Sequence, residues 1–170
     1  MTIPSDVAAY LAGAMDSDGS IGVRKSTYAA RHGEGRQATY SERICLKQVT
    51  PHIPELLKET FGGSLMMQRP STTKGRPLYY WEATNVVASE ALRAMLPFLR
   101  IKRAQAENCL ALRASKDLPR SATHVHREAS RARTGTGTHM IRRMEVSPAT
   151  LAEREAIYDR ARALNKVGAR

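Results

Sequence analysis

Two aspartates two residues apart, Asp16 and Asp18, are the residues of this sequence whose types and spacing point most directly to chemistry. They follow an almost charge-free run, residues 7–12, which predicts a helix, and they precede Gly19, which we expect to make a turn at positive φ. Carboxylates at this end of a helix face the negative pole of its dipole and repel each other. A divalent cation would reverse that penalty, because carboxylate oxygens suit Mg²⁺. The alternative is a solvated turn, since Asp and Gly are ordinary turn residues.

The charge of the chain points to a polyanionic partner. The 170 residues include 27 Lys and Arg against 16 Asp and Glu, giving a net charge of +11 and an isoelectric point near 10.2. Nucleic acid is the first candidate for such a partner, and a solvated basic surface without a partner is the alternative. A chain of this length is expected to form one domain with a real core.

Cysteine usage and hydropathy exclude other classes of protein. Cys45 and Cys109 lie in apolar segments without a CxxC spacing, which favours buried thiols in a reducing compartment over a cysteine zinc site. The sequence has no signal-peptide pattern and no apolar run long enough to span a membrane. We therefore expect an intracellular protein without a membrane partner, in an organelle or in a bacterial or phage cytoplasm.

The order of predicted elements indicates an α+β domain. Apolar periodicity and turn residues predict two hairpins that alternate with helices, and hence an antiparallel sheet with helices on one face and an open basic face. The core is expected over about residues 5–115, followed by a basic, flexible connection over about residues 116–146. A last helix over about residues 148–166 should pack back on the core. The predicted strands are residues 20–28, 40–49, 64–69 and 78–84, and helices precede, separate and follow the two hairpins.

The open face of the sheet is the predicted DNA-binding surface. Arg and Lys on an exposed strand face can reach phosphates and base edges in a major groove. In the second hairpin Met67, Tyr79 and Trp81 are further candidates for this face, although a lone Trp next to tyrosines is more often a core residue. The predicted DNA contacts are Arg24, Ser26, Tyr28, Arg31, Arg36, Arg43, Lys47, Arg69, Lys74 and Arg76.

Residues 11–19, LAGAMDSDG, resemble the LAGLIDADG motif of homing endonucleases. The replacements Ala14, Met15 and Ser17 are mild, and the order of elements over about residues 6–115 is similar to the αββαββα core of that family. The resemblance implies that the motif helix packs against a second motif helix through small residues. In this chain those residues are Ala9, Ala12 and Gly13.

The same resemblance implies the catalytic residues. Asp18 corresponds to the acid that binds the catalytic metal, which would be Mg²⁺ with Mn²⁺ as a substitute. The segment LPFLRIKRAQA, residues 96–106, is similar to the one that carries the active-site lysine of the family, and that lysine is Lys102 here. Gln48 stands where many members place a polar residue that orders water. Asp16 is expected to be a capping or supporting group.

One copy of the motif implies half of an interface and half of a double-strand cleavage site. The resemblance therefore implies a metal-dependent, intron-encoded type of homing endonuclease, a mobile genetic element product that cleaves a long pseudo-palindromic duplex as a homodimer. A non-cleaving RNA-binding maturase or DNA-binding regulator with the same fold is the main alternative. A simple basic DNA-binding protein is another, and an excised intein domain is disfavoured because no splicing termini are evident.

Overall fold

The computed structural model describes residues 3–26, 37–70, 75–118 and 146–167. Within these ranges the predicted order of helices and hairpins is confirmed, and no helix there is long and apolar enough to cross a lipid bilayer. The elements are α1 (Ser5–Asp18), β1 (Gly19–Ser26), β2 (Thr39–Gln48), α2 (His52–Phe61), β3 (Ser64–Gln68), β4 (Leu78–Thr84), α3 (Asn85–Met95), α4 (Arg103–Asp117) and α5 (Pro148–Val167).

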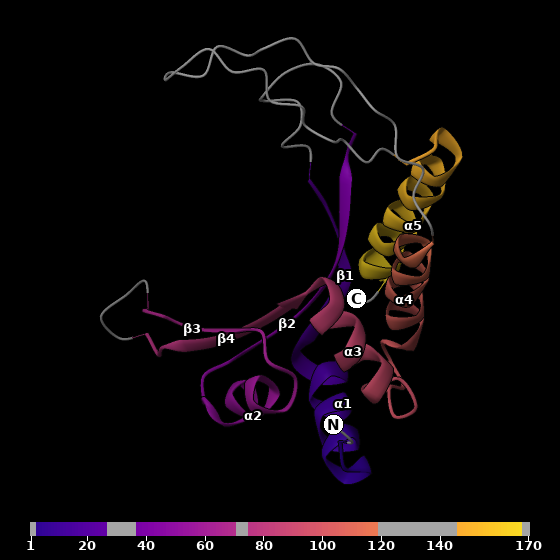
Figure 1. The fold of residues 1–170 in the computed structure, drawn as a ribbon. Coiled ribbons are helices and arrows are strands. Elements are labelled where there is room, and N and C mark those ends of the chain that lie inside the picture. Colours follow the sequence, from indigo (N-terminus) through magenta and orange to yellow (C-terminus); the bar gives the residue numbers. More distant parts are fainter. Residues whose placement is uncertain (1–2, 27–36, 71–74, 119–145, 168–170) are drawn as a thin grey trace, which may run out of the picture.

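The four strands form one antiparallel sheet in the order β1-β2-β4-β3. The register places Ile21 opposite Ile44 and Leu46 opposite Trp81, and these side chains are buried on the side of the helices. Figure 1 shows α1, α2, α3 and α4 gathered on that side, and no helix of the described residues covers the other side of the sheet. The predicted fold, an α+β domain with one open sheet face, is therefore confirmed.

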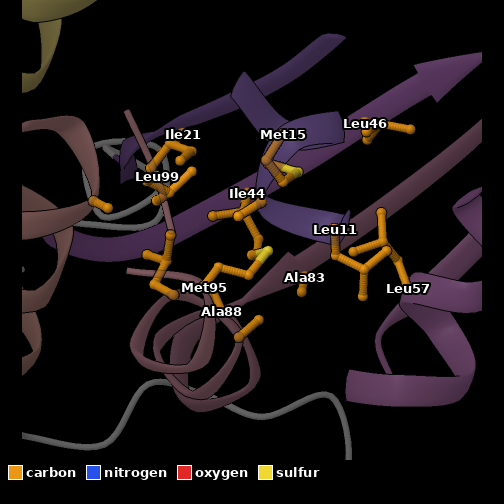
Figure 2. Close-up of a cluster of buried hydrophobic side chains, with 14 of the residues drawn as sticks. Leu11, Met15, Ile21, Ile44, Leu46, Leu57, Ala83, Ala88, Met95 and Leu99 are labelled. Carbon is orange, nitrogen blue, oxygen red and sulfur yellow. The ribbon is translucent and has the colours of Figure 1, made fainter. Parts of the chain in front are cut away.

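The core forms where α1 and α3 pack against the middle of the sheet. Figure 2 shows Met15 of α1 beside Ile44 of β2, with Met95 and Leu99 closing the cluster from the segment around the end of α3. Each of these side chains is almost fully removed from water, and burial of one such side chain contributes about 1.5–3 kcal/mol. This packing fixes the position of α1 relative to the sheet.

Trp81, whose side of the sheet the sequence leaves open, belongs to this core and not to the DNA-binding face. The indole is fully buried, and its Nε1–H donates to the carbonyl oxygen of Gly62 at 2.9 Å. Tyr79, two residues earlier, shares the helix side by strand alternation, and Met67 lies opposite it in the register. The open side of β4 is instead formed by the alternate positions, including Tyr80 and Glu82.

Gly19 is required by close packing rather than by a positive φ, which corrects the sequence expectation. Its φ is −78°, an ordinary value for any residue. A Cβ atom at this position would lie 2.5 Å from Cε and 2.7 Å from the carbonyl oxygen of Met15. The glycine therefore lets β1 begin directly against the end of α1.

Helix α5 packs against α4 and the edge strand β1, as expected of the final helix. The Lys25 ammonium lies 2.6 Å from the Glu155 carboxylate, which also accepts a hydrogen bond from the Tyr40 hydroxyl. Near the other end of α5, the Asn165 amide donates to the carbonyl oxygen of Ile21 at 3.3 Å. These contacts cover the edge of the sheet and so protect it against pairing with another chain.

The pH dependence of the α5 contact can be predicted from Glu155. The hydrogen bond from Lys25 holds the pKa of Glu155 below its usual value. A lowered carboxyl pKa stabilises the fold at pH values above the unfolded pKa, and this contribution is lost as the pH falls through the folded pKa. Glu155→Gln should therefore lower the melting temperature at pH 7, with a difference from wild type that shrinks below about pH 4.

Asp159→Asn is the matched control, because Asp159 is exposed on the same helix. It should leave the melting temperature unchanged at both pH values. An equal effect of the two substitutions would contradict the assignment of the α5 anchor to Glu155.

Candidate functional site

Asp18 and Gln48, two of the predicted catalytic residues, lie together. Asp18 is the last residue of α1 and is exposed, and Gln48 is the last residue of β2. The Gln48 amide nitrogen donates to Asp18 Oδ2 at 3.0 Å, and the Ser17 hydroxyl donates to Oδ1 at 3.1 Å. The antiparallel pairing of β1 with β2 causes this proximity, because β1 begins immediately after Asp18, at the end where β2 finishes.

Lys102, the third predicted catalytic residue, lies at the same end of α1. Its ammonium donates to the carbonyl oxygens of Met15, Asp16 and Ser17 at 2.8, 2.7 and 3.3 Å. The last carbonyls of a helix lack partners within the helix, and a cation there also interacts favourably with the helix dipole. Since an ammonium has three protons, all of them are directed at the backbone of α1. Lys102 is thus a fixed positive charge beside the Asp18 carboxylate.

Asp16 makes the converse contact with the start of α4. Its carboxylate accepts hydrogen bonds from the backbone N–H groups of Arg100, Ile101 and Lys102 at 2.7, 3.2 and 2.8 Å. A side chain of α1 therefore fixes the segment that leads into α4, while the side chain of Lys102, the residue before α4, caps the end of α1. We call this arrangement the reciprocal cap: Asp16, Lys102, and the backbone of residues 15–17 and 100–102.

The charge states of the cap follow from its surroundings. Partial burial acts to raise the pKa of Asp16, but the backbone hydrogen bonds outweigh it, and the pKa of Asp16 is lowered. For Lys102 the loss of solvent lowers the pKa, and the carboxylates of Asp16 and Asp18 partly oppose this shift. Asp16 therefore stays ionised while it holds the backbone of the 100–102 segment.

The capacity of the site for a metal ion rests on Asp18. Both oxygens of Asp16 accept backbone hydrogen bonds, whereas the Asp18 carboxylate is exposed. Across the described ranges, no group of three or more His, Cys, Asp or Glu side chains could hold a metal. Mg²⁺ takes oxygen ligands in octahedral geometry and often keeps several waters with one or two carboxylates. The site of one chain therefore offers a single exposed carboxylate, which fits a cation only if water, substrate or another molecule supplies the other oxygens.

The predicted DNA contacts divide into three groups. By strand alternation Arg24, Ser26, Arg43 and Lys47 lie on the open face of β1 and β2. Arg69 and Arg76 are exposed, between the end of β3 and the start of β4. The remaining predicted contacts, Tyr28, Arg31, Arg36 and Lys74, lie outside the described residues.

Tyr80 and Glu82 of β4 are part of the open face and were missed by the sequence analysis. Arg43 donates from Nε to Glu82 Oε1 at 3.0 Å, and from Nη2 to Glu82 Oε2 at 3.2 Å and to the Tyr80 hydroxyl at 2.6 Å. The Tyr80 hydroxyl also donates to Glu82, and the Lys47 ammonium lies 5.0 Å from the centroid of the Tyr80 ring. The alternation of β4 could have revealed both residues once Trp81 was placed in the core.

The side of α1 that faces away from the sheet is open. Gly13 is exposed, a Cβ there would meet no atom of the described residues within 4 Å, and Tyr10 is 50% exposed. Ala9, predicted for an interface, is partly exposed beside them. Ala12, predicted for the same interface, is instead fully buried in the core of its own chain. Small residues occupy two faces of α1, and only one of these faces is free to contact another molecule.

Comparison with known proteins finds similarity in structure. No protein-family model matches the sequence, and no curated protein is significantly similar to it. The homing endonuclease I-CvuI, in complex with the I-CreI target and 2 mM Mg with the DNA not cleaved, matches with a TM-score of 0.60 at 18% identity, over 92% of this chain and 80% of that chain. I-CvuI with its own target and 2 mM Ca gives a TM-score of 0.58 at 17% identity, over 94% and 82%. The archaeal intron-encoded homing endonuclease I-Vdi141I, complexed with DNA, gives 0.49 at 18% identity, over 64% and 67%.

The reciprocal cap predicts that the two aspartates differ in their effect on stability. Asp16→Ala leaves three backbone N–H groups without their acceptor and should lower the free energy of unfolding by about 1–2 kcal/mol. Asp18→Asn loses no buried contact and removes a carboxylate from the negative end of a helix dipole, so it should stay within about 0.5 kcal/mol of wild type. Urea unfolding measures both, and equal destabilisation by the two substitutions would contradict the assignment.

Proposed function

This chain has the fold of the LAGLIDADG homing endonucleases, and we propose that it is a site-specific endonuclease that cleaves double-stranded DNA with a divalent metal ion. The observation that carries the proposal is the convergence of Asp18, Gln48 and Lys102 at one end of α1. This end adjoins the part of β2 from which Lys47 faces solvent on the open side of the sheet.

The nature of the surface and the structural relatives support DNA as the substrate. The chain carries a net charge of +11, and basic side chains line the uncovered face of the sheet. I-CvuI, a homing endonuclease of similar fold, is bound to DNA targets in both structures, in the presence of Mg or Ca. These complexes support a divalent cation as a participant, with Mg²⁺ as our choice for this chain and Mn²⁺ as a substitute.

Hydrolysis requires a water oxygen to attack phosphorus while the bond to the leaving ester oxygen breaks and that oxygen gains a proton. A divalent cation supplies charge compensation at the phosphate and activates water. In this chain Asp18 would hold the cation, and the Gln48 amide fixes the Asp18 carboxylate while its own oxygen can accept a hydrogen bond from water. Lys102 contributes a fixed positive charge against the negative charge that develops at the phosphate. Its protons are committed to the α1 backbone, so this role is electrostatic.

We further propose that two copies act together. One chain supplies one exposed carboxylate at the site and one motif helix with an open side, which includes Gly13. Packing of two such helices about a two-fold axis would bring two Asp18 carboxylates to one site and would require a pseudo-palindromic target.

Comparison of DNA cleavage by wild-type protein and by the Asp18→Asn variant tests the proposed function. Wild-type protein should enrich a pseudo-palindromic site from randomised duplexes in Ca²⁺ and cut it on addition of Mg²⁺. Asp18→Asn should bind the same site and cut it at least about 100-fold more slowly, because the metal loses its protein ligand.

Asp6→Asn is the control for the same change of charge on the same helix, at its distant exposed end. It should cut at the wild-type rate. Binding of a specific site by wild type without cutting would overturn the nuclease proposal and favour a non-cleaving maturase or regulator.

The proposed dimer is tested at Gly13. A leucine there has room in the isolated chain, and replacing glycine in a helix interior favours the helix by up to about 1 kcal/mol. Gly13→Leu should therefore keep the fold by circular dichroism but shift the mass in sedimentation equilibrium from two chains towards one. A wild-type mass of one chain, both with and without DNA, would contradict the homodimer.

A further inference from the structure

Arg43, Tyr80 and Glu82 form a cluster of opposite charges in the middle of an otherwise basic surface, and we call it the face cluster. The guanidinium belongs to β2, and the other two side chains belong to the neighbouring strand β4. The Arg43 side chain is 42% exposed and the Glu82 side chain 20%, so both can be reached from the open side of the sheet. Glu82 places a carboxylate where approaching DNA phosphates would be repelled, which is unfavourable on a surface that binds DNA only through its phosphates.

Counting hydrogen bonds shows which atoms of the cluster remain available. Arg43 uses its Nε proton and both Nη2 protons on Glu82 and Tyr80, so its two Nη1 protons have no partner among the described residues. Glu82 Oε2 accepts from Arg43 and from Tyr80, whereas Oε1 accepts one hydrogen bond and keeps a lone pair. The face cluster therefore offers two adjacent donors on one nitrogen, beside one acceptor.

The charges of the cluster argue against a role in binding phosphate. The hydrogen bond from Arg43 holds the pKa of Glu82 below its usual value, so the carboxylate remains ionised and cancels the guanidinium charge. A neutralised pair adds little to the attraction of a polyanion. The pair does hold the guanidinium in one orientation, so less side-chain entropy is lost on binding. Such a group is suited to contacts with base edges, which carry sequence information.

The hydrogen-bonding pattern selects one kind of base pair. In the major groove a G·C pair presents two adjacent acceptors, guanine N7 and O6, followed by the cytosine N4 donor. An A·T pair presents its adenine N6 donor between two acceptors, which does not match two adjacent donors beside an acceptor. We propose that Arg43 and Glu82 together read one G·C base pair in each half of the DNA target. Arg43 Nη1 donates to guanine, and Glu82 Oε1 accepts from cytosine N4.

This inference rests on the proposed function, and it is tested by binding alone. Wild type, Glu82→Gln, Arg43→Lys and Lys47→Ala are each used to select sites from randomised duplexes in Ca²⁺ at one salt concentration. Thermal unfolding of each variant establishes that it is folded. Arg43→Lys provides a second test that does not depend on Glu82→Gln, since it keeps the charge but loses the planar fork.

Wild type should prefer G·C over A·T at one symmetric position of each half-site. Glu82→Gln and Arg43→Lys should each reduce that preference by about tenfold or more and leave the other positions unchanged. Lys47→Ala, the control in the same region, should weaken binding to all DNA sequences alike. It should also reduce the slope of the logarithm of the binding constant against the logarithm of salt concentration by about one.

Two results would overturn the inference, and they are distinguishable. If both cluster variants fold and keep the wild-type preference at every position, the face cluster only ties β2 to β4, and the proposed function stands. If wild type enriches no sequence, the proposed function fails together with the inference.

Discussion

The reciprocal cap between Asp16 and Lys102 is the interaction on which the candidate site depends. Without it, the end of α1 would present unpartnered carbonyls and two carboxylates at the negative end of a helix dipole. The Lys102 ammonium donates hydrogen bonds to these carbonyl oxygens, and both carboxylate oxygens of Asp16 accept hydrogen bonds from the backbone N–H groups of the segment before α4. The two aspartates of one short motif therefore separate into a structural carboxylate and an exposed one. Asp18 can be exposed beside a fixed ammonium because Asp16 holds the backbone of Lys102 and the carbonyl oxygens at the end of α1 hold its ammonium.

On the open face of the sheet, too, charged side chains of one type fall into two groups with different contacts. Most of its charged side chains are basic and suit a polyanion, whereas Arg43 is neutralised by Glu82. Unpaired basic side chains attract DNA of any sequence. An oriented, neutral pair instead provides hydrogen-bonding groups that can distinguish bases. Helix α5 closes the edge of the same sheet through Glu155 and Asn165, which leaves the uncovered face as the surface for a partner.

The sequence predicted the order of the elements and the residues that meet at the end of α1, because the motif and the segment around Lys102 carry the resemblance. It did not predict where the Lys102 protons go, since their acceptors lie 85 to 87 residues away along the chain. Trp81 was ambiguous because a Tyr-Tyr-Trp run has no alternation to assign a face. Ala12 and Gly13 look alike as small residues, and only the packing of α1 separates core from open surface.

The most direct test of the central claim, that Asp18 of each of two chains serves a metal-dependent cut, is strand-resolved mapping of the cleavage positions on the selected duplex. Wild-type protein with Mg²⁺ should cut each strand once, at positions related by the two-fold axis of the pseudo-palindrome. Mixed dimers with one Asp18→Asn chain should cleave more slowly than wild type or not at all, because the account requires Asp18 from both chains. Equal cutting by wild type and by Asp18→Asn homodimers, or cutting without symmetry, would contradict the account.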